Sequence, residues 1–263
     1  MDVDVIIQGD ALKEMRAFPA ECIDLTVTSP PYDNLREYHG YTFDFESIAK
    51  ELFRVTKPGC VVVWVVGDAT IKGSETGTSF RQALYFKEIG FNLHDTMIYQ
   101  KTGFNFPMKD RYYQSFEYMF IFSKGKIDTF TPLQQPRTGH VGYSVGTDKR
   151  GNKKSIVYDP QKITRPRDNV WKILNHGKNA TVDDFAYNHP AIFPEQLASD
   201  HILSWSNPGD LILDPMCGSG TTCKMARYHD RHYIGIDISS EYCDIARRRV
   251  AAIPARLDRW STP

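Results

Sequence analysis

The peptide Ser29-Pro30-Pro31-Tyr32 combines hydrogen-bond acceptors with a flat aromatic ring. The Ser29 hydroxyl and the Pro30 carbonyl accept hydrogen bonds, and the two prolines stiffen the turn that aims them. Two fixed acceptors can take both N–H bonds of an amine attached to a ring, while Tyr32 stacks on that ring. The nitrogen then becomes pyramidal, and its lone pair can attack an electrophile without a covalent intermediate. Taken alone, the peptide is equally consistent with a plain diproline turn.

A second peptide, residues 214–222, has the composition of a nucleotide-binding turn. A strand-like run leads into Asp214 and then into Gly218-Ser219-Gly220, which precedes a predicted helix. Glycines let the backbone approach a ligand closely, and a helix N-terminus offers unpaired N–H groups. Asp237 ends the next predicted strand and could accept the hydroxyls of a ribose. The order strand, glycine turn, helix, strand and acid predicts a cofactor that contains adenosine.

The nearest rival for this turn is an NAD site. The Gly-x-Gly-x-x-Gly fingerprint of such sites needs a third glycine where Cys223 stands. A tight turn without a ligand is the plain alternative. Cys217 is better explained as a small packed residue than as a nucleophile. The five cysteines contain no Cys-x-x-Cys pair and the histidines have no metal-ligand spacing, so no metal is expected.

Strand-like and helix-like segments alternate along most of the chain, and this alternation must position the two peptides. Predicted strands cover residues 3–7, 23–28, 60–66, 93–100, 118–123, 211–213 and 233–236, and predicted helices cover 12–18, 45–55, 79–89, 194–205, 221–228 and 240–252. The pattern predicts an α/β fold with a doubly wound, mostly parallel sheet that helices cover on both faces. Residues 125–180 are rich in Gly, Pro, Lys, Arg and Asn, and they read as an irregular insertion.

Composition narrows the class of protein. The 263 residues are 41% hydrophobic, which suffices for one large domain with an insertion or for two modest domains. No run approaches the roughly 18 apolar residues of a membrane span, and a reducing cytoplasm is the expected location. The net charge is zero, yet residues 101–180 carry fifteen basic and six acidic residues. Such a segment is as consistent with a nucleic-acid footprint as with solvated loops.

These residues resemble the DNA amino-methyltransferases that use S-adenosylmethionine, in their permuted beta order. In that order the Ser/Asp-Pro-Pro-Tyr motif comes first, a target-recognition region follows, and the glycine loop comes last. The resemblance covers most of the chain and implies a class I methyltransferase fold. It divides the chain into a catalytic half at 1–124, a target-recognition insertion at 125–185 and a cofactor-binding half at 186–263. The product of the cofactor would be S-adenosylhomocysteine.

The resemblance also implies roles for individual residues. The base would be held and activated by Ser29, Pro30, Pro31 and Tyr32. The cofactor would contact Asp10, Phe193, Asp214, Pro215, Cys217, Gly218, Ser219, Gly220, Thr221 and Asp237, and His189 either faces the cofactor or simply leads into Pro190. Candidates for DNA contact are Arg36 and Tyr38 in a lid or surface loop, Phe116 and Tyr118 at the base, the basic cluster Lys149, Arg150, Lys153 and Lys154 at phosphates, and Arg165 and Arg167 at guanine.

The implied substrate is an exocyclic amine of a base flipped out of duplex DNA. Thr28-Ser29-Pro30-Pro31-Tyr32 favours cytosine N4, because the family usually carries Asp in place of Ser29 for adenine N6, which is the runner-up. Cytosine C5 chemistry fits poorly, because the motif contains no cysteine. A protein-glutamine or RNA methyltransferase, or a catalytically silent DNA-binding module, are the alternatives of another class. No membrane partner is expected, and the family resemblance suggests a homodimer and a companion restriction endonuclease.

Overall fold

The computed structural model describes residues 1–31, 43–102, 110–137, 143–148, 150–157, 163–174, 180–189 and 192–253. The chain forms two compact units. The main unit comprises Met1–Thr131 with Asn169–Pro263, and the small unit is Pro132–Asp168. The predicted insertion at 125–185 is therefore longer than the small unit. Residues 170–173 belong to the main unit because they pair as a strand with its sheet.

An eight-stranded sheet forms the centre of the main unit, in the order β1-β14-β13-β2-β3-β7-β6-β12. The strands are β1 (Val5–Gln8), β14 (His232–Asp237), β13 (Leu211–Asp214), β2 (Ile23–Thr28), β3 (Thr56–Val66), β7 (Phe116–Ser123), β6 (Asn92–Lys101) and β12 (Val170–Ile173). Only β7 runs antiparallel to its neighbours β3 and β6, and the other pairings in this sheet are parallel. The predicted mostly parallel sheet is confirmed.

The direction of chain progression reverses between β13 and β2. From β2 the chain proceeds to β3 on one side, whereas from β13 it proceeds to β14 on the other. In open α/β sheets, ligands bind beyond the carboxyl ends of the strands at such a reversal. The segments that leave these two ends begin at Ser29 and Pro215, so the fold brings the two chemical peptides to the reversal point.

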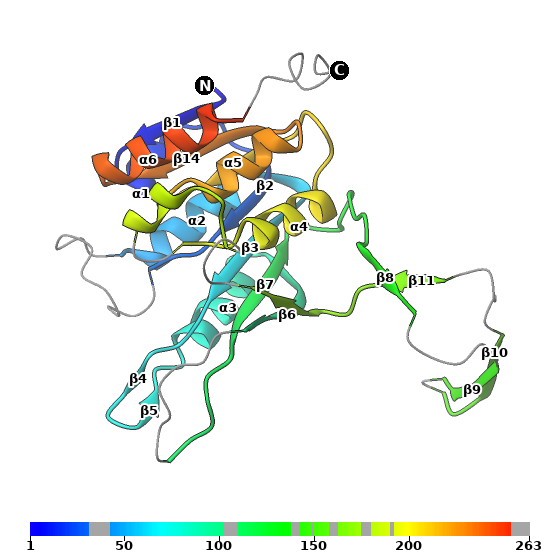
Figure 1. Cartoon of the computed structure of the whole chain (residues 1–263). Coiled ribbons are helices and arrows are strands. Elements are labelled where there is room, and N and C mark those ends of the chain that lie inside the picture. Colours follow the sequence, from blue (N-terminus) through cyan, green and yellow to red (C-terminus); the bar gives the residue numbers. More distant parts are fainter. Residues whose placement is uncertain are drawn as a thin grey trace. The chain divides into compact units, whose positions relative to one another are not determined.

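Helices cover both faces of the sheet (Figure 1). One face carries α1 (Ala11–Arg16), α2 (Phe45–Val55) and α3 (Thr78–Glu88), and the other carries α4 (Glu195–Trp205), α5 (Thr221–Tyr228) and α6 (Ser240–Ala251). The 3₁₀ helix η2 (Asp184–Asn188) contacts α6. Side chains of Asp10, Asp44 and Ser239 cap α1, α2 and α6 by accepting a backbone N–H three residues on.

The core on the α1–α3 face is built around Trp64 of β3. Trp64 is fully buried, its ring lies 5.2 Å from that of Phe86, and its indole N–H donates to Gln82 Oε1 at 2.9 Å. Phe86 stacks on Phe122 at 4.4 Å. Ile48, Leu52 and Val55 complete this core from the apolar face of α2. None of the described helices has the length and apolar character needed to cross a membrane.

The small unit contains two antiparallel ribbons where the sequence predicted irregular structure. The first pairs β8 (Gln134–Pro136) with β11 (Thr164–Pro166), and the second pairs β9 (Tyr143–Thr147) with β10 (Lys153–Val157). These strands have only three to five residues, too few for a clear periodic pattern, so pattern analysis misses them. A further short hairpin in the main unit, β4 (Thr70–Ile71) with β5 (Ser74–Glu75), is also unpredicted.

Candidate active site

A hydrogen bond connects the two chemical peptides at their roots. The Thr28 hydroxyl, at the end of β2, donates to Asp214 Oδ1, at the end of β13, over 2.8 Å. Both side chains are buried, and β2 and β13 are neighbouring parallel strands. Because Ser29 follows Thr28 directly, this bond fixes the start of the Ser29-Pro30-Pro31 peptide beside the glycine turn. Pro30 is buried, whereas Ser29 and Pro31 are half-buried.

Asp214 sits in an environment that disfavours its charge. Burial raises the pKa of Asp214 to about 6, although hydrogen bonds from Thr28, Thr222 and the Met216 amide oppose the shift. The Asp214 carboxylate therefore accepts hydrogen bonds from groups of the protein itself, at the starts of the two loops. These bonds join the end of β2 to the loop after β13, and the contact of Asp214 with the cofactor stays a prediction.

The turn at residues 217–220, here called the glycine turn, needs glycine at both Gly218 and Gly220. Both have positive φ, at +48° and +77°. A Cβ on Gly220 would lie 2.5 Å from Ala246 Cβ of α6, and one on Gly218 would lie 2.7 Å from His189 Nε2. The first glycine of the turn is thus dictated by the ring of His189 and the second by close packing on α6.

Asp237 closes the other side of the glycine turn. It ends β14, and its carboxylate accepts the amides of Gly218 through Oδ2 and of Ser239 through Oδ1, each at 2.9 Å. Burial raises the pKa of Asp237 from its ordinary value. Each carboxylate oxygen can accept more than one hydrogen bond, so these two contacts leave acceptor capacity on Asp237 for ligand hydroxyls.

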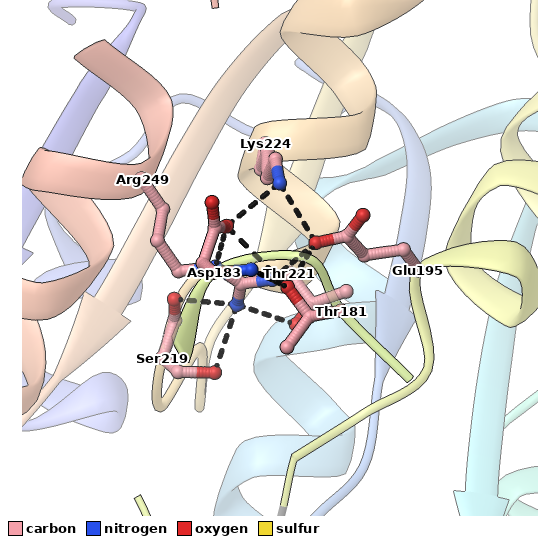
Figure 2. Close-up of polar contacts among 7 residues, drawn as sticks. All are labelled: Thr181, Asp183, Glu195, Ser219, Thr221, Lys224 and Arg249. Atoms are coloured by element: carbon pink, nitrogen blue, oxygen red, sulfur yellow. Dashed lines mark hydrogen bonds and ion pairs between the residues drawn. The ribbon is translucent and has the colours of Figure 1, made fainter. Parts of the chain in front are cut away.

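A cluster of charged side chains lies against the glycine turn, and we call it the buried charge cluster (Figure 2). It contains two cations and two carboxylates, with three hydroxyl side chains: Lys224, Arg249, Asp183, Glu195, Thr181, Ser219 and Thr221. Lys224 Nζ bonds Asp183 at 2.7 Å and Glu195 at 2.8 Å. Arg249 is fully buried and bonds the same two carboxylates at 2.8 and 2.7 Å.

Pattern analysis of the sequence does not predict this cluster. Arg249 follows Arg247 and Arg248, and a run of three arginines in a helix normally indicates a solvated face. The usable signal is helical spacing, because Arg249 lies three residues after Ala246 and next to Val250, which are both buried. A cation on the buried face of an amphipathic helix requires a buried anion, which here is supplied by Asp183 and Glu195.

The segment 180–189 contacts helices α5 and α6 through three of its side chains. Besides the ion pairs of Asp183, the Arg248 guanidinium lies 3.8 Å from the centre of the Phe185 ring. His189 packs edge-on against Tyr242 of α6 at 4.3 Å between ring centres. The position of His189 over Gly218 is consistent with the role at the cofactor that the sequence left open, and this role stays a prediction.

A family model described as DNA methylase matches residues 23–248, which include both chemical peptides. The chain belongs to the N6/N4 DNA methylase family. It is 58% identical over 238 residues to the orphan methyltransferase M.BamHII of Bacillus amyloliquefaciens, a match that covers 87% of this chain and 88% of the relative. It is 30% identical to the DNA adenine methyltransferase YhdJ of Escherichia coli strain K12, over 95% of this chain and 83% of that protein.

Among solved structures, this methylase is similar in fold to the PvuII DNA methyltransferase, which is described as cytosine-N4-specific. The TM-score is 0.68 at 22% identity, over 93% of this chain and 85% of that chain. Structures with S-adenosylmethionine bound also match this fold. S-adenosylmethionine is the cofactor of the methylase. The chain's own residues fit it, because Asp237 offers carboxylate oxygens with spare acceptor capacity at a strand end, beside the glycine turn.

The other predicted cofactor residues lie at or near the same edge of the sheet. Asp10 follows β1 and caps α1 through Lys13 N at 2.8 Å. Pro215 and Cys217 are buried in the loop after β13, and Phe193 is half-buried just before α4. The Cys217 thiol lies beside that of Cys223, and this contact together with burial raises its pKa well above the ordinary value. That environment favours the interpretation of Cys217 as a packed residue.

The structure describes some of the residues predicted to contact the target base or the DNA, but not all of them. Tyr32, Arg36, Tyr38 and Lys149 lie outside the described residues, and the structure describes only the backbone of Lys154. Phe116 begins β7 and is exposed; its ring meets Tyr118 edge-on at 5.4 Å, and Tyr118 stacks on Phe120 at 5.3 Å. Burial raises the pKa of Tyr118. Phe116 and Tyr118 stand at the start of β7, where Tyr118 pairs with Val66 at the end of β3. The Ser29 peptide leaves β2 at this same edge of the sheet, because Thr28 pairs with Trp64 of β3.

Among the basic residues of the small unit whose side chains are described, two are exposed and the others are half-buried. Arg150 and Lys153 are exposed near the turn that joins β9 to β10, which is organised by Asp148 through the amides of Arg150 and Asn152. Arg165 forms a two-point ion pair with Asp168, at 2.5 and 2.8 Å. Arg167 donates its amide to the Leu133 carbonyl at 2.8 Å. Within the described residues, no group of three or more His, Cys, Asp or Glu side chains could hold a metal ion.

Proposed function

We propose that this methylase transfers the methyl group of S-adenosylmethionine to the exocyclic N4 of a cytosine in duplex DNA. The observation that carries the proposal is the 2.8 Å bond between Thr28 and Asp214, which ties the acceptor peptide to the cofactor strand. The acceptor beside that bond is Ser29, a neutral hydroxyl, in the sequence context that favours cytosine.

In this proposal the bound cofactor supplies an electrophilic methyl group on a sulfonium. The chain's contribution is to orient the amine. The Ser29 hydroxyl and Pro30 carbonyl accept its two N–H bonds and direct its lone pair toward the cofactor side of the site. Neither acceptor is a base at neutral pH, so both act through position and electrostatics rather than by removing a proton beforehand.

The target amine lies inside the base stack, so the proposal requires base flipping, which costs a few kcal/mol. Tyr32 would stack on the flipped base and offset part of that cost. Phe116 and Tyr118 would line the far side, and Arg36 and Tyr38 would close the site. Arg150, Lys153, Arg165 and Arg167 of the small unit would contact phosphates and base edges, with Lys149 and Lys154 as further phosphate ligands.

Adenine N6 is the second candidate, and the similarity to YhdJ favours it. The chemistry differs only in which amine the two acceptors hold. A carboxylate would be the stronger acceptor for either base, so physical reasoning about Ser29 alone leaves both amines open. The choice of cytosine rests on the motif.

The test is mass spectrometry of nucleosides from unmodified duplex DNA treated with the purified protein and a deuterium-labelled methyl donor. Labelled N4-methylcytosine is the expected product. Labelled N6-methyladenine without N4-methylcytosine would transfer the proposal to adenine. Parallel reactions offer RNA or protein in place of DNA. Label in either of these but not in DNA would show that the enzyme belongs to the other substrate class, the protein or RNA methyltransferases.

We further infer that the protein acts in the cytoplasm on duplex DNA. We infer that it does so as a homodimer, and a companion restriction endonuclease is not needed for the reaction. Light scattering of the purified protein tests the dimer. A monomer that methylates DNA at the full rate would remove the dimer from the proposal. The relative described as an orphan methyltransferase favours action without an endonuclease.

A further inference from the structure

The guanidinium of Arg249 divides its donors between the glycine turn and the segment 180–189 (Figure 2). Toward the turn, Nη1 donates to the Ser219 carbonyl at 2.9 Å, to the Ser219 hydroxyl at 3.0 Å and to the Thr221 hydroxyl at 2.8 Å. Toward the segment, Nε donates to Asp183 at 2.8 Å and Nη2 donates to Thr181 at 3.1 Å. We propose that Arg249 is a positioning residue for S-adenosylmethionine, which holds the glycine turn in its binding conformation.

The bonds around the turn explain why its orientation depends on Arg249. The Gly218 amide is held by Asp237, and the Gly220 amide donates to the Cys217 carbonyl at 2.7 Å. Arg249 fixes the Ser219 carbonyl, which shares a rigid plane with the Gly220 amide. The peptide plane between residues 218 and 219 thus has a fixed plane on each side. Asp237 holds the preceding plane through the Gly218 amide, and Arg249 holds the following plane through the Ser219 carbonyl. The orientation of this middle plane, and with it that of the Ser219 N–H, is therefore restricted from both sides.

Lys224 provides a comparison inside the same cluster. It bonds the same two carboxylates, Asp183 and Glu195, but its ammonium has no hydrogen bond to Ser219 or Thr221 among the described residues. A purely structural cluster would make both cations equally important for stability and equally unimportant for the cofactor. A positioning role for Arg249 separates them, because only Arg249 reaches the turn.

The experiment measures the Kd for S-adenosylmethionine by calorimetry, with thermal unfolding of the same samples. Arg249→Lys keeps the charge but loses the planar fork, and we expect its Kd to rise about tenfold, with kcat at saturating cofactor within about twofold of wild type. Lys224→Gln should lower the unfolding temperature while its Kd changes less than about twofold. Arg247→Lys is the matched control, since Arg247 lies on the same helix but pairs with exposed Asp244 and the Ile6 carbonyl, with no hydrogen bond to the glycine turn in the described part of the chain; it should leave the Kd unchanged.

A double-mutant cycle tests whether Arg249 acts through the turn. Thr221, which follows the turn as the first residue of α5, accepts from Arg249, and Thr221→Val should weaken the Kd about threefold more in the wild-type background than in the Arg249→Lys background, because the part of its effect that passes through that bond is already lost. Additive effects on the Kd would overturn the proposal. So would an unchanged Kd for Arg249→Lys, or equal losses of affinity for Arg249→Lys and Lys224→Gln.

A further variant covers the case in which Arg249→Lys does not fold. Thr181→Val removes an Arg249 acceptor on the far side of the guanidinium, away from the turn. The proposal expects about a threefold weaker Kd for this variant in a folded protein. An unchanged Kd would contradict it. All of these measurements are independent of the methylated base, so a failure here is distinct from a failure of the N4-cytosine proposal.

Discussion

Two aspartate–arginine pairs, one in each unit, keep an aspartate charged in surroundings that differ in burial. In the main unit, burial would raise the pKa of Asp183, but hydrogen bonds from Lys224 and Arg249 outweigh it and leave the pKa below its ordinary value. In the small unit, Arg165 and Gln135 lower the pKa of the exposed Asp168 to about 2. The buried pair must stay complete, whereas the exposed pair can break and re-form in water. The charges of the buried charge cluster are thus committed to one another, whereas the charges of Arg165 and Asp168 stay accessible to solvent.

The largest expected effect concerns catalysis at the cofactor end. Ser29→Ala should reduce methyl transfer at least about a hundredfold, because one acceptor of the amine is lost from a site where such groups act in the transition state. The Kd for S-adenosylmethionine should stay within about twofold, since the glycine turn is unchanged. Radiolabel transfer and calorimetry measure the two quantities. Retained activity would remove Ser29 from the mechanism.

Stability tests the contrast between the two pairs directly. Arg249→Met leaves two partly buried carboxylates with one cation, and we expect the free energy of unfolding to fall by about 3 kcal/mol. Arg165→Ala should leave the urea midpoint unchanged within error, because exposed ion pairs contribute little. Similar losses for both variants would contradict the distinction between the buried and the exposed pair.

The pH dependence of stability isolates Asp214. Its folded pKa of about 6 lies above the ordinary value, so its contribution is complete below about pH 4 and is lost as the pH rises through 6. Relative to Asp214→Asn, which keeps an acceptor for Thr28, wild type should lose about 2 kcal/mol of unfolding free energy between pH 4 and pH 7. Urea titrations at several pH values measure this difference. Parallel pH curves for the two proteins would exclude the shifted carboxyl.

The smallest expected effect on the fold lies in the small unit. Arg150→Ala and Lys153→Ala should leave the unfolding temperature and the Kd for S-adenosylmethionine unchanged. Each should weaken DNA binding severalfold and reduce the salt dependence of binding by about one unit of slope. Fluorescence anisotropy at several salt concentrations measures both. Unchanged DNA binding would place these residues outside the DNA interface.

The sequence predicted what depends on local pattern. Periodicity predicts the alternating strands and helices, and turn chemistry predicts Gly218, Gly220 and the acid at Asp237. The structure places these three residues at one edge of the sheet. The bond between Thr28 and Asp214 joins residues 186 positions apart, and no local pattern reports such a contact.

The buried charge cluster and the ribbons of the small unit escaped prediction for different reasons. Arg249 has the sequence appearance of a surface residue, and only the tertiary fold brings Asp183 and Glu195 to it. The strands β8 to β11 are too short for a clear periodic pattern, so their residues look irregular. Residues 170–173 were assigned to the insertion because their pairing with β6 is a long-range contact.

The account depends most on the claim that the Ser29 peptide and the glycine turn face one reacting centre. A crystal structure of the protein with S-adenosylhomocysteine tests it most directly. The account predicts that the homocysteine sulfur lies between the glycine turn and Ser29-Pro30, with the ribose hydroxyls on Asp237. A nucleoside bound elsewhere, or a sulfur turned away from Ser29, would contradict it.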